Sequence, residues 1–307
     1  MDEHNENPAV AENMQGEENY ELIQEACQLP SGNILDPLDT YSITAAEKSC
    51  FVVIMGATGS GKTTLVTSIY QQFLCGDFLD KYCFAGSETL MAFEERAHYT
   101  RTISNGLEPQ TSRTPRGSIN DILHLRIKDN QKNRKVNLLL SDFSGEDFEN
   151  AVANIEVARQ DFNLVKSAKK IVVIVDGANI ATPRKRASEI QKAINILKTF
   201  FDGELTHNNV DVLIVLSKYD LTKEKVDEEY LESISDSFVK QIPELKNRVG
   251  FLRVAAMPTN TDEVALGFGL NDLLDEFLKD NIKEVEEEKM PNLLSQFHLW
   301  GVNLIAK

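Results

Sequence analysis

One stretch of the sequence combines three glycines with a lysine and two threonines: FVVIMGATGSGKTTLVTSIY, residues 51–70. A triphosphate is a dense anion, and consecutive backbone N–H groups can wrap it only where side chains do not intervene. The segment GATGSGKT fits the pattern G-x-x-x-x-G-K-[ST] at every position. Because an apolar run precedes it and a helical pattern follows it, the stretch predicts a phosphate-binding loop between a strand and a helix.

The residues of this loop have separate expected roles. Lys62 should reach the β- and γ-phosphates, where it would also act in catalysis, and the Thr63 hydroxyl should bind Mg²⁺. The helix that begins near Lys62 directs its N-terminal N–H groups and its dipole toward the phosphates. The candidate nucleotide-binding residues of the loop are Gly56, Ala57, Thr58, Gly59, Ser60, Gly61, Lys62, Thr63 and Thr64.

A second candidate segment is VNLLLSDFSGEDFEN, residues 136–150, in which an apolar run ends at Asp142 and Gly145 follows three positions later. A carboxylate at the end of a strand beside the phosphate loop can hold a Mg²⁺-bound water, and the Gly145 N–H can meet the γ-phosphate. Since that contact exists only with a triphosphate, the segment can act as an on/off element.

A third segment, VLIVLSKYD at residues 212–220, indicates the base. It ends in S-K-x-D, close to the N/T-K-x-D signature of guanine-binding proteins, with Ser217 in place of the usual Asn or Thr. The Asp220 carboxylate can accept from both N1–H and the 2-amino group of guanine, whereas adenine would leave it unpaired. The Lys218 stem should pack along the base. In RVAAM, residues 253–257, Ala256 stands where guanine binders often carry Ser-Ala-Lys.

The hydrophobic pattern predicts the elements that must position these loops. Strands alternating with helices imply right-handed crossovers and a mainly parallel sheet covered on both faces. Strands are expected at 51–55, 121–127, 136–140, 171–175, 212–216 and 250–256. Helices are expected at 62–73, around 88–98, and at 190–201, 230–238 and 270–278.

Together these motifs resemble the translation-factor-related (TRAFAC) class of P-loop GTPases over residues 50–280. The segments FAGSETLMAFEER and LLLSDFSGEDFE are similar to the double-GTPase family, prokaryotic proteins associated with conflict and anti-phage systems. The resemblance implies an α/β fold, a three-layer P-loop NTPase whose Ras-like, mostly parallel sheet has one antiparallel strand at 121–127. It also implies a GTP-dependent switch coupled to an effector protein or a partner GTPase, with Mg²⁺ and GTP or GDP as ligands.

The resemblance further implies a first-switch threonine that caps Mg²⁺ and senses the γ-phosphate. Thr111 is the first candidate and Thr114 the second, and their spacing does not separate them. The same stretch contains Arg113 and Arg116. Either could act as an internal arginine finger on the transition-state charge, with Arg113 the catalytic candidate, or both could face solvent or a partner.

Glu146 directly follows Gly145, at a position that holds a water-orienting glutamine in many relatives. An ionised glutamate only accepts hydrogen bonds, and it would lie close to phosphate charge. We therefore expect slow hydrolysis, or hydrolysis that depends on a partner.

The two ends of the chain differ from its centre. Residues 1–48 are polar, and eleven of the 48 acidic residues precede the first basic one. This segment is expected to be disordered or to fold only against a partner, with a regulatory or merely solvating role. The GTPase domain is expected at 49–282, with a long insert at 75–120, and 283–307 should form a linker and an amphipathic helix. That helix would pack on the body or dock a protein partner.

The composition narrows the partners. Beyond the acidic end the chain is only mildly acidic, which argues against a nucleic-acid surface. The four cysteines show no metal-binding spacing, and no signal peptide or membrane span is apparent, so a cytoplasmic protein with reduced thiols is expected. The oligomeric state stays open. Two alternatives to a GTP switch also remain: a nucleotide-binding scaffold with negligible hydrolysis, and an ATPase of the same superfamily.

Overall fold

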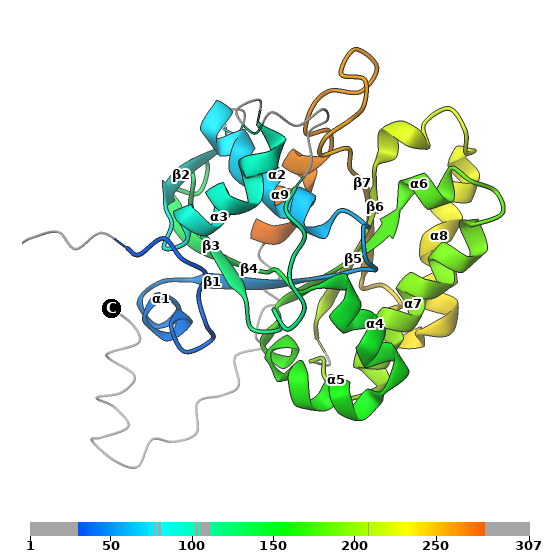
Figure 1. Ribbon diagram of the computed structural model, residues 1–307, viewed down its shortest axis with the longest axis horizontal. Helices are drawn as coiled ribbons and strands as arrows, with labels where there is room; N and C mark the ends of the chain where they lie inside the picture. Colours follow the sequence, from blue (N-terminus) through cyan, green and yellow to red (C-terminus); the bar gives the residue numbers. More distant parts are fainter. Residues whose placement is uncertain are drawn as a thin grey trace, which may run out of the picture. The chain divides into compact units, whose positions relative to one another are not determined.

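A seven-stranded sheet runs through the described part of this computed structural model, which comprises residues 30–279 except 77, 79, 80, 102, 103, 105–110 and 208. The described residues from Ser31 onward belong to one compact unit (Figure 1). The strands are β1 (Ser49–Met55), β2 (Tyr82–Gly86), β3 (Ile122–Asp129), β4 (Arg134–Ser141), β5 (Lys170–Asp176), β6 (Asp211–Ser217) and β7 (Val249–Arg253).

The strand order is β2-β3-β4-β1-β5-β6-β7. β3 runs antiparallel to both of its neighbours, and all the other pairings are parallel. The predicted α/β fold, a mostly parallel sheet with one antiparallel strand, is therefore confirmed. β1 lies between β4 and β5 in the sheet. The chain passes from β1 to β2 on the β4 side and later crosses from β4 to β5 on the other side of β1. Ligands of open α/β sheets bind at such a switch point, beyond the carboxyl ends of the strands.

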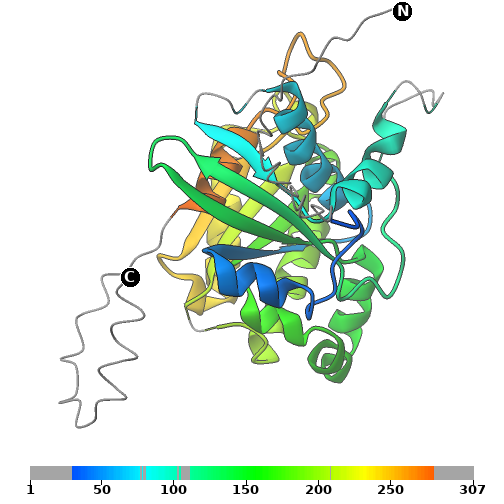
Figure 2. The ribbon, with the colours of Figure 1, turned by 90° about the vertical axis from the view of Figure 1, so that its left-hand side faces the viewer.

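Helices cover both faces of the sheet, as Figures 1 and 2 show. One face packs on α2, α3 and α9, and the other packs on α4, α5, α7 and α8. Val52 and Ile54 of β1 enter the first core and Val53 and Met55 the second, so this central strand is buried on both sides. The helices of these layers are α2 (Lys62–Cys75), α3 (Leu90–Ala97), α4 (Gly145–Ala153), α5 (Ile155–Asp161), α7 (Arg186–Asp202), α8 (Glu228–Gln241) and α9 (Leu270–Leu278).

The expected connection at 75–120 contains a strand that the sequence pattern did not reveal. β2 is a five-residue edge strand paired only with β3, and its Phe84 is 42% exposed. A short edge strand with one face in solvent lacks the continuous apolar run of a central strand. The helix expected around 88–98 is present as α3, and the last strand ends at Arg253, before the expected 256.

Helices α4 and α5 were not predicted either, although α4 carries a readable signal. Ser144 caps α4 by accepting a hydrogen bond from the Glu146 N–H, and Glu146 and Asp147 lie in its first turn. Serine followed three positions later by an acidic residue is a helix-start signature. The same residues form the candidate phosphate-sensing motif, so one stretch carries both the helix start and the candidate γ-phosphate contact.

The expectation of disorder for residues 1–48 is wrong for residues 31–48. Leu35 exchanges two backbone hydrogen bonds with Ile122, with N···O distances of 3.0 and 3.1 Å, and α1 (Thr40–Ala46) follows. This bridge to β3 satisfies both backbone groups of Leu35 despite the polar composition of the segment. Residues 1–29 and the predicted helix within 283–307 lie outside the described residues. Among the helices that are described, none has the length and apolar character needed to cross a membrane.

Candidate nucleotide-binding site

A pocket of about 600 Å³ opens beyond the carboxyl ends of β1, β4 and β6. Its volume lies in the usual range for small-molecule sites. All three candidate motifs contribute to it, together with the 111–114 stretch of the insert. The lining residues include Thr58, Gly59, Gly61, Lys62, Thr63, Thr64, Thr111, Arg113, Thr114, Gly145, Ser217, Lys218, Asp220 and Ala256.

The phosphate loop joins β1 to α2 as predicted. Gly61 caps α2 with a φ of 99°, a left-handed conformation that favours glycine. The buried Lys62 ammonium donates to the carbonyls of Gly56 and Ala57 at 2.9 and 3.0 Å. Burial lowers the pKa of Lys62 to about 8, against the opposing attraction of Asp142. The lysine is therefore held inside its own loop, at the N-terminus of α2.

The second segment lies directly against this loop. A Cβ atom on Gly145 would come within 2.5 Å of the Thr58 backbone nitrogen, so only glycine fits this close approach. Glu149, one turn along α4, accepts a hydrogen bond from the Thr58 N–H at 3.2 Å. The N-terminal half of α4 thus contacts the phosphate loop through the backbone of Gly145 and the side chain of Glu149.

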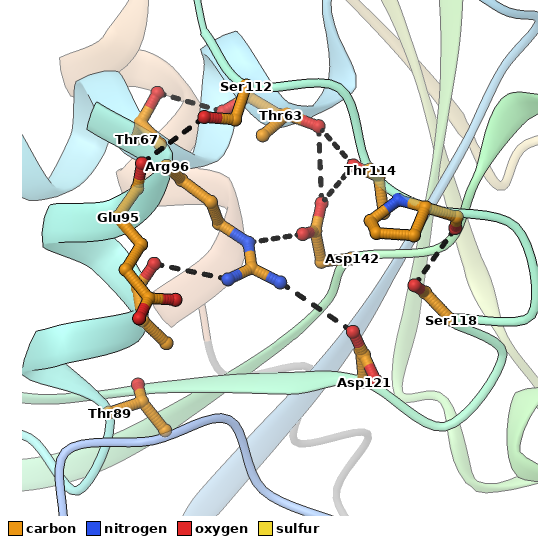
Figure 3. Close-up of polar contacts among 12 residues, drawn as sticks. Thr63, Thr67, Thr89, Glu95, Arg96, Ser112, Thr114, Ser118, Asp121 and Asp142 are labelled. Atoms are coloured by element: carbon orange, nitrogen blue, oxygen red, sulfur yellow. Dashed lines mark hydrogen bonds and ion pairs between the residues drawn. The ribbon is translucent and has the colours of Figure 1, made fainter. Parts of the chain in front are cut away.

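Three oxygen-bearing side chains from separate segments meet at the edge of the pocket (Figure 3). The hydroxyls of Thr63 and Thr114 lie 2.7 Å apart. Both donate to Oδ1 of Asp142, at 3.3 and 3.2 Å respectively. The structure therefore brings together Thr63 of the phosphate loop, Asp142 at the end of β4 and Thr114 of the insert.

The donor chemistry of this cluster fits Mg²⁺. Two hydroxyls and one carboxylate are hard oxygen donors, and Mg²⁺ is usually held by one or two carboxylates, water and substrate phosphates. Among the described residues, no group of three or more His, Cys, Asp or Glu side chains could hold a metal ion. A magnesium ion at this cluster would therefore depend on phosphate oxygens as well as on Thr63, Thr114 and Asp142.

Thr111, the first candidate for the switch threonine, lies elsewhere in the pocket. The hydroxyl of Thr111 is 3.0 Å from that of Thr64, one position beyond Thr63 on α2. Thr114 occupies the place beside Thr63 and Asp142 that we expected of Thr111. Sequence spacing could not choose between them, because the path of the irregular 111–114 stretch decides which hydroxyl faces the cluster.

Glu146 meets the two arginines that were predicted separately. Its carboxylate forms ion pairs with Arg113 and Arg116, one through each oxygen. The arginine side chains are 71% and 75% exposed, while that of Glu146 is 15% exposed. Asp147 of α4 also accepts a hydrogen bond from the Gly117 N–H at 3.0 Å. The first turn of α4 thus holds the 111–118 segment mainly by polar contacts near the surface.

The S-K-x-D segment is tied to the phosphate loop. The Ser217 hydroxyl donates to the Ser60 carbonyl at 2.8 Å, so this serine links the end of β6 to the loop in place of the usual Asn or Thr. The Lys218 ammonium donates to the Gly59 carbonyl at 2.9 Å and pairs with Asp176 at 3.0 Å. These contacts lay Lys218 along the pocket wall.

Asp220 lines the same wall as Lys218. Its Oδ2 atom accepts hydrogen bonds from the backbone N–H and the hydroxyl of Thr259, both at 3.1 Å. Thr259 was not predicted; it follows the AAM segment by two residues, and its polar side chain near Ala256 was the available signal. Ala256 itself lines the pocket beside Met257.

Arg96 of α3 is a second residue that the sequence did not indicate. Its Nε atom donates to Oδ2 of Asp142 at 2.5 Å (Figure 3). The two residues are 46 positions apart, and no local pattern connects them. Only the packing of α3 against the sheet places this guanidinium at the cluster.

Comparison with known families decides the class of the protein. A family model described as Double-GTPase 2 matches residues 50–278. The chain belongs to the Double-GTPase 2 family. The predicted likeness to double-GTPases is therefore confirmed, and membership of a Double-GTPase 2 family supports GTP binding. The matched range contains all the predicted site residues.

Solved structures similar to this Double-GTPase 2 member share little sequence with it. The bacterial selenocysteine-specific elongation factor EF-Sec is 17% identical with a TM-score of 0.38, and the match covers 76% of this chain and 30% of that one. The SRb-GTP/SRX signal recognition particle receptor complex from Chaetomium thermophilum is 13% identical with a TM-score of 0.41, and the match covers 70% of this chain and 93% of that one. Methanosarcina barkeri Roco2 RocCORdC bound to GDP is 16% identical with a TM-score of 0.37, and the match covers 76% of this chain and 50% of that one. A comparison with the curated proteins gives no match.

Proposed function

We propose that this chain is a GTP-operated switch that hydrolyses GTP slowly in the presence of Mg²⁺. The observation that carries the proposal is the contact of Thr63 and Thr114 with Asp142 at the edge of the pocket that Asp220 also lines. One site thereby combines a phosphate loop, oxygen donors suited to Mg²⁺ and an acceptor suited to guanine.

Each residue of the pocket has a role in this proposal. Lys62 and the N–H groups of the loop bind the β- and γ-phosphates, and Asp220 accepts from the guanine edge. Thr63, Thr114 and Asp142 would hold Mg²⁺, which neutralises charge on the phosphates when it is bound. Thr259 donates twice to Oδ2 of Asp220 and so holds this carboxylate at the pocket wall, where it can accept from the guanine edge.

The 111–118 segment is the proposed moving part. It contributes Thr114 to the cluster. Two surface ion pairs with Glu146 and a hydrogen bond to Asp147 attach it to α4. Such contacts are individually weak and exchangeable. A γ-phosphate that engages Thr114 and the Gly145 N–H would therefore change the position of this segment relative to α4.

Slow hydrolysis follows from the state of Glu146. Its carboxylate is engaged by Arg113 and Arg116, so it is not free to orient an attacking water. The exposure of both arginines makes them accessible to a partner protein. We propose that an effector or a partner GTPase in the cytoplasm binds this segment, releases Glu146 and accelerates hydrolysis. The double-GTPase resemblance supports a setting in prokaryotic conflict or anti-phage systems.

A nucleotide-binding scaffold is the second candidate, and the same ion pairs favour it. If Glu146 stays paired in every complex, the bound nucleotide would stabilise an assembly without being hydrolysed.

Two measurements on the full chain separate these proposals. Mass spectrometry of the nucleotide retained by the purified protein should give GDP or GTP, whereas retained ADP or ATP would contradict the proposal. Single-turnover assays with GTP should then show slow conversion to GDP that candidate partners accelerate. Retained GTP with no conversion under any condition would favour the scaffold.

A further inference from the structure

Arg96 connects the cluster at Asp142 with two neighbouring segments, the start of β3 and the 111–118 segment. Besides its bond to Asp142, the guanidinium lies 3.6 Å from Asp121 and donates to the Ala92 carbonyl at 3.1 Å (Figure 3). The Arg96 carbonyl accepts a hydrogen bond from the Ser112 N–H at 3.3 Å. Arg96 thus contacts the end of β4, the start of β3 and the segment that carries Thr114.

The charge of Arg96 acts at close range on Asp142. The Asp142 side chain is 1% exposed and that of Arg96 is 13% exposed, so water screens their interaction only weakly. The two oxygens of Asp142 are divided between partners: Oδ2 accepts from Arg96, and Oδ1 accepts from Thr63 and Thr114. Arg96 therefore sets the direction in which Oδ1 points.

Any cation that uses Oδ1 must share this carboxylate with the guanidinium. Two positive groups on one carboxylate repel each other, and the repulsion is larger where both are shielded from water. Asp121 offsets part of the guanidinium charge at 3.6 Å, but it leaves the Arg96–Asp142 contact the shorter of the two.

We propose that Arg96 is a positioning residue that orients Asp142 and, through its charge, weakens the Mg²⁺ affinity of the nucleotide site. This inference rests on the proposed function. It adds that a residue of α3 sets the Mg²⁺ concentration needed to retain nucleotide. Because α3 also holds Ser112 through the carbonyls of Glu95 and Arg96, a shift of α3 would alter both the cluster and the 111–118 segment.

The test measures how much Mg²⁺ is needed to retain nucleotide, rather than turnover. The full chain is loaded with a fluorescent GDP analogue, and its dissociation rate is followed at increasing Mg²⁺ concentration. The Mg²⁺ midpoint is the concentration at which the slowing of dissociation is half complete. Arg96→Gln keeps a donor for Asp142 but removes the charge, so we expect this midpoint to fall about tenfold. Arg96→Lys, which keeps the charge, should leave the midpoint close to that of the unsubstituted chain.

Arg101→Gln is the matched control on the same stretch, because Arg101 pairs with Glu94 and not with Asp142. It should not move the midpoint. Thermal unfolding checks that each variant is folded. If Arg96→Gln does not fold, Arg96→Met is used as the neutral variant.

The outcomes are distinct. An unchanged or higher midpoint in the neutral Arg96 variant would overturn the inference, since loss of positioning alone can only weaken Mg²⁺ binding. Equal midpoints in the Lys and Gln variants would also overturn it. If the unsubstituted chain binds the GDP analogue without any Mg²⁺ dependence, or does not bind it, the proposed function itself fails.

Discussion

Two walls of the nucleotide pocket are built in different ways. The first, which we call the anchored wall, consists of the phosphate loop at 56–64 and the loop at 217–220. The second, the exposed wall, is the 111–118 segment. Ser60 is 1% exposed and Ser217 8%, and the contacts of the anchored wall run largely to backbone carbonyls. The arginines of the exposed wall are more than 70% exposed and pair with the side chain of Glu146.

This difference separates binding from response. The anchored wall lies at the ends of buried parallel strands, and hydrogen bonds from Ser217 and Lys218 to the phosphate loop hold its two loops together. The exposed wall contributes the Thr114 hydroxyl to the cluster with Thr63 and Asp142, and its polar contacts can be exchanged at little cost. Substitutions in the anchored wall should therefore abolish binding or change its specificity, and substitutions in the exposed wall should change the Mg²⁺ and γ-phosphate dependence.

The largest effect is expected at Lys62. Lys62→Met keeps the length of the side chain and removes its charge, so we expect GDP and GTP affinity to fall about 100-fold, because charge-assisted hydrogen bonds to phosphate are lost. Isothermal titration calorimetry measures this fall, with thermal unfolding as the check on folding. An affinity within a few-fold of the unsubstituted chain would contradict the anchored wall as the phosphate site.

Asp220→Asn should change which base is bound. The amide keeps the size of the side chain but no longer accepts from both guanine donors, so we expect the preference for GTP over ATP to drop about 100-fold. Competition between the two nucleotides for a fluorescent GDP analogue gives the ratio. An unchanged ratio would show that Asp220 does not face the base and would support the ATPase alternative.

In the exposed wall, the two threonines should respond differently. Thr114→Val removes a hydroxyl that faces Thr63 and Asp142, so the Mg²⁺ concentration needed to retain GTP should rise about tenfold. Thr111→Val is the matched control, because Thr111 bonds to Thr64 outside the cluster. If the Mg²⁺ requirement rises only in the Thr111 variant, Thr111 rather than Thr114 is the first-switch threonine.

The pH dependence of binding tests Lys62 of the anchored wall. Burial lowers the pKa of Lys62 to about 8, so its charge is present at pH 7 and is lost as the pH rises through that value. GDP affinity should therefore decline several-fold between pH 7 and 9. The Lys62→Met variant, titrated at higher concentration, should show no such decline. A flat profile in the unsubstituted chain would contradict this role of the ammonium.

The smallest effect is expected for the surface arginines. Arg113→Gln and Arg116→Gln each remove an exposed ion pair, so the free energy of unfolding should change by less than about 1 kcal/mol. Urea denaturation measures it. A loss above about 2 kcal/mol in either variant would show that the exposed wall is structurally fixed, because such pairs rarely contribute that much.

The two walls were also unequally predictable from sequence. Gly56, Lys62 and Asp220 follow local patterns whose spacing is set by a strand end, a tight turn and a helix start, so their positions could be predicted. The central strands could be predicted for the same reason, because burial on both faces requires continuous apolar runs.

The remainder depends on contacts between distant segments. Arg96 reaches Asp142 only because α3 packs on the sheet, and the choice of Thr114 over Thr111 depends on the path of an irregular segment. The edge strand β2, with its exposed Phe84, lacks a strong apolar pattern, and residues 31–48 are ordered by pairing with β3 rather than by composition.

The most direct test of the account is calorimetric titration of the full chain with GTP and with ATP at millimolar Mg²⁺. We predict that GTP binds at least about 100-fold more tightly, since Asp220 can accept from both N1–H and the 2-amino group of guanine, whereas adenine presents an unprotonated N1 there. Equal affinity for the two nucleotides, or tighter binding of ATP, would contradict the central claim that this pocket selects guanine.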